Sequence, residues 1–330
     1  MKQHRIVSLD LIRVIAILLV ITQHAWTGLQ LDEPTAGIGR YLYQALVVMG
    51  VPLFFMLSGA LMLTAKPLPI NDFLTRRCKR LLLPFVLWAT LIYIISAAMH
   101  KYPEIDTLQD ALRCYLPYML TDKVNASYWY VFVLIGIYLL TPFLQRALLA
   151  PQARQLIRYG LALWIGWIVL HSYYPQFGSM HYYSASAFMY LGFYLCGHYC
   201  VSYLTNEHIN RRIGVIGFIL AYALDVAGLV AEANTTLVHM IATVCLFLLL
   251  KSCTPPYRNT EFITTAGRYT YFIYFSHILV VSLFCMLNIW EWCPLWLRPI
   301  IITLLSFAIS YTTAYILDHT RFIPKKWIGI

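Results

Sequence analysis

Two polar side chains of the first hydrophobic segment, Arg13 and His24, have the types and the spacing for chemistry inside a membrane. Eleven residues of α-helix make three turns plus about 20°, so both side chains lie on one face, about 16 Å apart along the axis. A cation in a membrane helix costs about 2.5–3.5 kcal/mol on insertion scales, so such residues usually face an aqueous cavity or another helix. We predict a polar path along this face. The alternative is an arginine that reaches the interface and a histidine that ends the helix.

A second pair of basic side chains, Arg77 and Arg80, lies three residues apart in the segment FLTRRCKRLLLPF. At this spacing both side chains share one helix face. Guanidinium groups offer forked donors that match phosphate oxygens, so the pair is a candidate phosphate clamp. The alternative is the general excess of basic residues at the cytoplasmic ends of membrane helices.

Two further ionisable residues, His277 and Asp225, lie inside hydrophobic segments. Counted from Tyr269, the predicted start of its segment, His277 is about 12 Å deep, near the bilayer centre. It is either a structural histidine bonded to a neighbouring helix or a second histidine of the cavity that His24 faces. Asp225 is costly to bury as an anion, so we expect it to pair with Arg13 or with a histidine.

The composition indicates that the helices carrying these side chains lie in a membrane. The chain of 330 residues is 60% hydrophobic and 12% charged, with a mean hydropathy of +0.67, far more apolar than a soluble domain. The sequence predicts an all-α polytopic membrane protein with one domain over 1–330, about ten transmembrane helices and no soluble domain. The predicted helices are 7–28, 42–65, 81–100, 127–149, 157–173, 185–205, 213–232, 236–250, 269–290 and 297–317.

Lysine and arginine in the connecting segments set the orientation. With both termini in the cytoplasm, 18 of the 23 basic residues other than Arg13 fall on the cytoplasmic side. The net charge of +10 is therefore a signal of topology, and we expect no nucleic-acid partner.

The cysteines do not predict a metal site. Cys196, His198 and Cys200 are spaced so that the first and last share a helix face while the histidine points elsewhere, and no second ligand pair follows. We interpret these three side chains as packing residues and expect no bound metal.

Five segments in order resemble the acyltransferase 3 family, membrane enzymes that O-acylate bacterial surface glycans, peptidoglycan, lipopolysaccharide or small molecules. The resemblance lies in SLDLIRVIAILLVITQH, VPLFFMLSGALM, FLTRRCKRLLLPF, WYVFVLIGIYLLTP and TYFIYFSHIL. Two positions depart from the family pattern: Val14 stands where glycine is frequent, and Ser127 stands where a histidine often precedes the tryptophan.

The resemblance implies an inner-membrane enzyme that takes an acyl group from cytoplasmic acyl-CoA, most simply acetyl-CoA, with no permanently bound cofactor. The acceptor would be a cell-envelope glycan or lipid-linked saccharide, as in the stand-alone O-acetyltransferases that act on enterobacterial common antigen and similar glycans. Arg77 and Arg80 would hold the CoA phosphates. Arg13 would line the path of the donor to the catalytic His24, which would act as general base or as acyl acceptor.

Four other residues of the matching segments are candidate pore or acceptor contacts: Ser58, Trp129, Tyr274 and His277. Three alternatives stay open. A secondary transporter of a small anionic or sugar-like solute would also bury Arg, His and Asp, although no internal repeat supports it. A different class of membrane acyltransferase could use His239. A succinyl group could replace acetyl, because no residue discriminates between the two.

Overall fold

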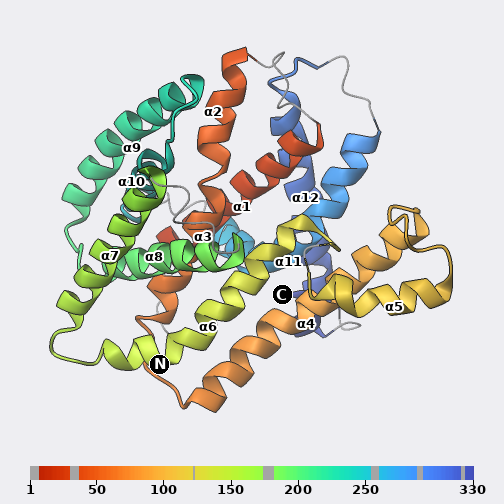
Figure 1. Cartoon of the computed structure of the whole chain (residues 1–330), viewed down its shortest axis with the longest axis horizontal. Coiled ribbons are helices and arrows are strands. Elements are labelled where there is room, and N and C mark those ends of the chain that lie inside the picture. Colours follow the sequence, from red (N-terminus) through yellow and green to blue (C-terminus); the bar gives the residue numbers. More distant parts are fainter. Residues whose placement is uncertain are drawn as a thin grey trace.

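The computed structural model describes residues 7–29, 37–121, 123–173, 182–253, 260–287, 293–320 and 324–330. These residues form helices and no strand (Figure 1). The helices are α1 (Val7–Gly28), α2 (Gly37–Val47), α3 (Gly50–Met62), α4 (Ile70–Ala98), α5 (Leu108–Met119), the 3₁₀ turn η2 (Ala126–Tyr128), α6 (Trp129–Ala147), α7 (Ala153–Tyr173), α8 (Tyr182–Ser202), α9 (Glu207–Val230), α10 (Thr236–Lys251), α11 (Thr260–Met286), α12 (Arg298–His319) and α13 (Lys325–Ile328).

The predicted all-α membrane fold is confirmed. Each of the ten predicted segments overlaps a helix, and within the described ranges seven helical segments are long and apolar enough to cross a membrane. The helix α10 is apolar but shorter, and α7 and α8 are not among the seven. The count of ten spans stays a prediction.

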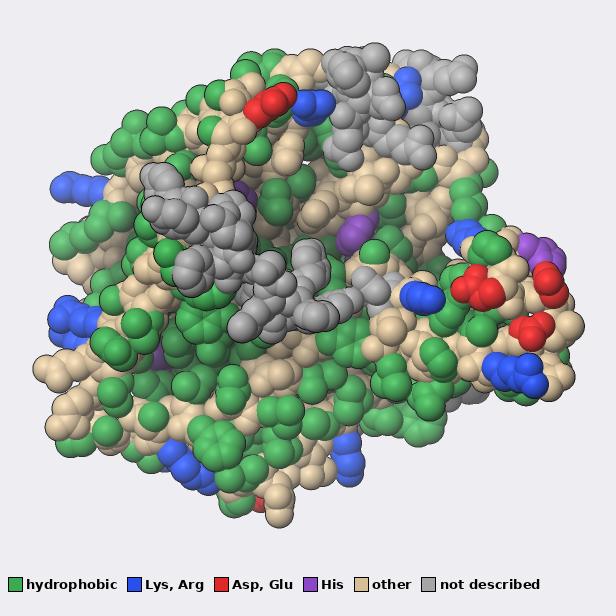
Figure 2. Space-filling view, in the orientation of Figure 1, with side chains coloured by type: hydrophobic (Ala, Val, Ile, Leu, Met, Phe, Trp, Pro, Cys, Tyr) green, Lys and Arg blue, Asp and Glu red, His purple; other side chains and the backbone are tan. Residues whose placement is uncertain are grey.

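The outer surface of the bundle suits lipid. Ile216, Ile219 and Leu224 of α9 are each about 60% exposed, although they lie in a strongly apolar helix. Figure 2 shows hydrophobic side chains over most of one face, with most of the visible Asp and Glu side chains gathered over α5 and the loop before it. Contact of these apolar surfaces with lipid tails costs little free energy, whereas their exposure to water would be unfavourable.

The helix α1 is central to the arrangement and packs against α3, α11 and α12. In Figure 1, α9 and α10 lie on one side of this group, and α4 and α5 extend on the other. The helix α11 packs on α4 as well as on α1. The helix α11 therefore connects α1 and α4, the two helices that carry Arg13, His24, Arg77 and Arg80.

The second predicted segment, 42–65, is two helices with a break at Val48 and Met49. Pro52 explains the break. A helical proline has no N–H for the carbonyl four residues earlier, here that of Val48, and its ring clashes with that carbonyl. The chain therefore restarts as α3, which begins at Gly50.

The helices α3 and α8 approach backbone to backbone through one glycine on each. A Cβ added at Gly59 would overlap the backbone of Tyr194, and one added at Gly197 would overlap the backbone of Met56. Small residues allow membrane helices to pack this closely, as the sequence VPLFFMLSG indicates. The contact fixes α3, which carries Ser58.

Two helices that carry candidate site residues begin about ten residues before the predicted transmembrane segments. The helix α4 begins at Ile70 instead of 81, so Arg77 and Arg80 lie within it, on the basic helix start that the sequence indicates. The helix α11 begins at Thr260 instead of 269, because the polar run TEFITTAGR continues the helix below the apolar segment. His277 is therefore 17 residues from the start of its helix, about 26 Å along the axis, although the added residues lie outside the apolar segment and leave its expected depth in the bilayer unchanged.

Candidate functional site

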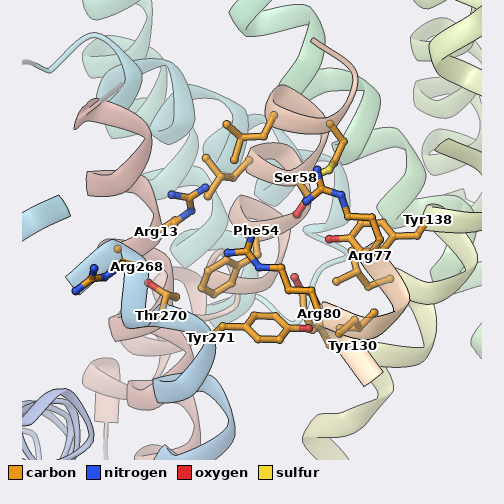
Figure 3. Close-up of a pocket in the computed structure, with 16 residues that line it drawn as sticks. Arg13, Phe54, Ser58, Arg77, Arg80, Tyr130, Tyr138, Arg268, Thr270 and Tyr271 are labelled. Carbon is orange, nitrogen blue, oxygen red and sulfur yellow. The ribbon is translucent and has the colours of Figure 1, made fainter. Parts of the chain in front are cut away.

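One end of α1 borders a cavity of about 280 Å³ that is lined by four arginines, and we call it the inner cavity. Arg13 comes from α1, Arg77 and Arg80 come from α4, and Arg268 comes from α11. Figure 3 shows Arg77 and Arg80 extending from α4 toward α3, with Arg13 on the other side. The uncharged lining residues include Phe54, Ser58, Tyr130, Tyr138, Thr270 and Tyr271.

The carboxylates near this cavity balance only part of its charge. Arg13 forms an ion pair with the buried carboxylate of Asp10, and Arg268 forms one with Asp318 at 2.6 Å. In the part of the chain that the structure describes, Arg77 and Arg80 have no carboxylate within ion-pair distance. The cavity therefore presents two uncompensated guanidinium groups, a surface that favours an anion with more than one charge.

The other end of α1 borders a second cavity of about 440 Å³, which we call the outer cavity. It is lined by His24, Thr27, Gly28, Asn125, Ala126, Ser127, Ile278, Val281, Ser282, Cys285 and Met286. None of these residues is a lysine, an arginine or an acid. The cavity offers hydroxyl, amide and imidazole groups, which suit an uncharged polar ligand such as a sugar.

The His24 ring lies near the side chains of Ser127 and His277. Its Nε2 atom lies 3.2 Å from the Ser127 hydroxyl, and its ring centroid lies 5.3 Å from that of His277. The Nδ1 atom of His277 lies 3.0 Å from the Ile273 carbonyl oxygen, which can only accept, so this nitrogen donates. His277 is fully buried, and among the described residues its Nε2 atom has no hydrogen-bond partner. The two predicted histidines are therefore neighbours.

Aromatic rings separate the two cavities. Tyr130 lines the inner cavity, and its ring centroid lies 5.4 Å from that of Tyr274. Tyr274 lies 6.0 Å from His277 in the same measure, and its hydroxyl donates to the Ser127 carbonyl at 2.7 Å. The predicted polar path along α1 is therefore two cavities with a wall of rings between them, which we call the ring wall and define as Tyr130, Tyr274 and His277.

With this geometry in place, comparison with known families decides the class. The family model described as an acyltransferase domain, acyltransferase 3, matches residues 6–317. The chain belongs to the acyltransferase 3 family. Comparison with curated proteins and with solved structures returned no match. The protein is thus a membrane acyltransferase, which requires an acyl donor and an acceptor.

The structure distributes the predicted site residues of this acyltransferase over three places. Arg13, Arg77, Arg80 and Ser58 line the inner cavity, and His24 lines the outer one. Tyr274 and His277 belong to the ring wall. Trp129 lines neither cavity, and its indole packs against the Tyr190 ring with centroids 5.1 Å apart.

Asp225 pairs with a histidine, one of the two partners that the sequence allows. Its Oδ2 atom lies 2.9 Å from Nδ1 of His239, across the contact between α9 and α10. His239 lines neither of the two cavities. This placement gives no support to an acyltransferase site built on His239.

Several lining residues were not predicted from the sequence. Arg268 was counted only as a cytoplasmic basic residue, because it directly precedes the predicted transmembrane segment 269–290. Tyr138 and Tyr130 were not distinguished from the other tyrosines of their apolar segment. Asn125 had a usable signal, since asparagine directly before a helical run is a preferred N-cap, and its side chain does accept from the Ser127 N–H.

Proposed function

We propose that the protein is an O-acyltransferase that moves an acyl group, most simply acetyl, from cytoplasmic acyl-CoA to a hydroxyl of a cell-envelope glycan or lipid-linked saccharide. The observation that supports the proposal is that the two ends of α1 border cavities with different lining groups. Cationic groups for phosphates lie at one end, and an imidazole among uncharged polar groups lies at the other. We place the protein in the bacterial inner membrane, with both termini and the inner cavity on the cytoplasmic side. The excess of basic residues on that side supports this orientation.

The donor half of the proposal rests on Arg77 and Arg80. Acyl-CoA carries several phosphate charges on its nucleotide part and a long uncharged arm that ends in the thioester. These two guanidinium groups, which have no ion-pair partner among the described residues, would hold the phosphates, and Arg13 lies further along the wall of the same cavity. The arm would then extend along α1 toward His24, about 16 Å from Arg13 along the helix axis.

The acceptor half rests on His24. As general base, its imidazole takes the proton of the acceptor hydroxyl while the oxygen attacks the thioester carbonyl. The C–S bond breaks, the acyl group stays on the acceptor oxygen, and the sulfur of CoA leaves with the proton that the imidazole returns. As acyl acceptor, His24 would itself attack the thioester and pass the acyl group to the hydroxyl in a second step. Both routes give the same products, an acyl ester and free CoA.

The ring wall adds a requirement. For the thioester to reach His24, the rings of Tyr130 and Tyr274 must move aside. Rotation of the Tyr274 ring would break the bond from its hydroxyl to the Ser127 carbonyl, and a hydroxyl left buried without a partner costs about 1–3 kcal/mol. The wall would open only when the donor arm occupies the inner cavity.

The test compares envelope glycans from cells with and without the gene. Mass spectrometry should find one envelope glycan that loses one acetyl group when the gene is deleted, and the wild-type gene should restore it while His24→Ala does not. In parallel, the purified protein in liposomes should release CoA from acetyl-CoA when a saccharide extract of the deletion strain is supplied. Identical glycans in both strains, together with intact acetyl-CoA, would overturn the proposal. Release of CoA from succinyl-CoA but not acetyl-CoA would change the acyl group.

A further inference from the structure

A short chain of hydrogen bonds leads to His24 from the turn before α6. The Asn125 Oδ1 atom accepts from the Ser127 backbone N–H at 2.9 Å, and it lies 2.9 Å from the Ser127 hydroxyl oxygen. The same hydroxyl oxygen lies 3.2 Å from Nε2 of His24. Ser127 is almost fully buried, and all three residues line the outer cavity.

The donor and acceptor groups of these hydrogen bonds fix where the protons lie. The backbone N–H of Ser127 can only donate, so the atom of Asn125 that faces it is the carbonyl oxygen, which can only accept. The Ser127 hydroxyl therefore donates its single proton to that oxygen. If the hydroxyl donated to His24 instead, two acceptor oxygens would face each other at 2.9 Å without a proton. Since its proton is used, the Ser127 oxygen accepts from His24, and Nε2 of His24 carries a hydrogen.

We propose that Asn125 and Ser127 are positioning residues that fix the tautomer of His24, with the proton on Nε2 and the reactive lone pair on Nδ1. The role of Nδ1 in the reaction rests on the proposed function, whereas the tautomer itself does not. In a neutral imidazole the nitrogen that donates a hydrogen bond leaves the other as base or nucleophile, so a fixed donor bond selects the reactive atom.

The assignment makes the proposed proton transfer specific to one atom. The acceptor hydroxyl gives its proton to Nδ1, its oxygen bonds the acyl carbon, and the C–S bond breaks. The sulfur of CoA then takes the proton from Nδ1, so the imidazole returns to its starting tautomer. Throughout the cycle Nε2 stays hydrogen-bonded to the Ser127 oxygen.

Nitrogen NMR tests the tautomer without turnover. Protein labelled with ¹⁵N-histidine is recorded in nanodiscs at alkaline pH, where imidazole is neutral, and the His24 signals are assigned by their loss in His24→Gln. We expect a protonated Nε2 and an unprotonated Nδ1. Asn125→Asp keeps an oxygen that accepts both bonds and should keep this pattern. In Asn125→Ala the Ser127 hydroxyl is released to donate to Nε2, so the pattern should shift toward the opposite tautomer.

Kinetics supply a second test with an unusual order of effects. Loss of one donor bond changes a tautomer ratio by up to about tenfold, so Ser127→Ala should lower kcat by about threefold and Asn125→Ala by about tenfold. The more distant residue has the larger effect, because its loss turns the serine into a donor to the wrong nitrogen. The double variant Asn125→Ala with Ser127→Ala should recover to about the Ser127→Ala level, with KM for acyl-CoA unchanged in all three.

Two results would overturn the inference. One is a wild-type His24 that carries its proton on Nδ1. The other is a double variant as slow as Asn125→Ala, or slower, since simple structural damage by the two substitutions would accumulate instead of cancelling. Full activity of His24→Ala would overturn the proposed function alone, because the NMR pattern does not depend on catalysis.

Discussion

The two cavities along α1 differ in charge, in polarity and in the helices that complete them. The inner cavity contains four arginines from α1, α4 and α11, two of them without ion-pair partners in the described structure. The described lining residues of the outer cavity include no charged side chain, and the turn before α6 and the end of α11 complete it. One helix thus presents an anion-binding group at one end and an imidazole at the other.

In the proposed function, this difference places recognition of the donor and the chemistry in separate cavities. Arginines next to the imidazole would favour its neutral form but would also attract the negative end of the donor, and the phosphates would then compete for the space of the acceptor. A separation of about 16 Å along α1 avoids that conflict. Substitutions in the inner cavity should therefore change mainly KM for acyl-CoA, and substitutions in the outer cavity should change mainly kcat.

The largest expected effect is in the outer cavity. His24→Ala should lower kcat by about 10²–10⁴-fold, the usual contribution of a general base, while the affinity for acyl-CoA stays at the wild-type value. Calorimetry with CoA and turnover with acetyl-CoA on the same preparation measure the two quantities. His208→Ala, which changes an exposed histidine of α9, is the matched control and should keep full activity. More than a tenth of the wild-type kcat in His24→Ala would exclude both catalytic roles and direct attention to His277.

The inner cavity should respond in the opposite manner. Arg77→Lys and Arg80→Lys each replace a forked donor by a point charge, so KM for acyl-CoA should rise by about tenfold with kcat preserved. Lysine keeps the positive charge, so topology does not change. Arg76→Lys, on an exposed neighbour that does not line the cavity, should have no effect. An unchanged KM in both test variants would leave the two arginines as determinants of topology only.

A substitution in the ring wall should lower kcat by less than the substitutions in either cavity change their kinetic parameters. Tyr274→Phe keeps the ring between the cavities but removes the bond to the Ser127 carbonyl, so the turn that contacts His24 loses one support. We expect kcat to fall by about threefold with KM for acyl-CoA unchanged, consistent with about one hydrogen bond. Tyr159→Phe, on an exposed tyrosine of α7, serves as control. A change confined to KM would mean that Tyr274 belongs to the donor cavity.

Cysteine labelling should change activity least of all, but it tests directly which side of the membrane each cavity opens to. Cys285 lines the outer cavity, so a membrane-impermeant maleimide added to intact spheroplasts should label it when Cys114 and Cys293 are replaced by alanine. A cysteine introduced by Ser58→Cys in the inner cavity should react only after the membrane is permeabilised. Labelling of the two sites from the same side would contradict the proposed orientation.

The sequence was sufficient for those features of the site that depend on one helix at a time. The spacing of Arg13 and His24, and of Arg77 and Arg80, follows from the geometry of a helix and needs no knowledge of neighbours. The long apolar segments likewise follow from the thickness of a bilayer. The helices α4 and α11 begin before the predicted transmembrane segments, because polar residues continue each helix beyond the apolar run that hydropathy identifies.

Contacts between helices could not be predicted in the same way. Nothing local in the sequence indicates that His277 lies against His24, since 253 residues separate them. The pairing of Asp225 with His239 also depends on how α9 and α10 pack, and the sequence allowed Arg13 equally. The bond between Ser127 and His24 is of the same kind. Such contacts are set by tertiary packing, which a single sequence with no repeat does not constrain.

The ring wall has a consequence for the energy metabolism of the cell. In the proposed orientation the two cavities extend inward from opposite sides, so a continuous aqueous passage would let protons and small ions run down their gradients. Each elementary charge gains about 2.3 kcal/mol per 100 mV of membrane potential, a constant force toward leakage. The rings of Tyr130 and Tyr274, in contact between the two cavities, would interrupt a file of water along this path between turnovers. In the proposed function, the acyl group would then cross the bilayer while the membrane stays electrically charged.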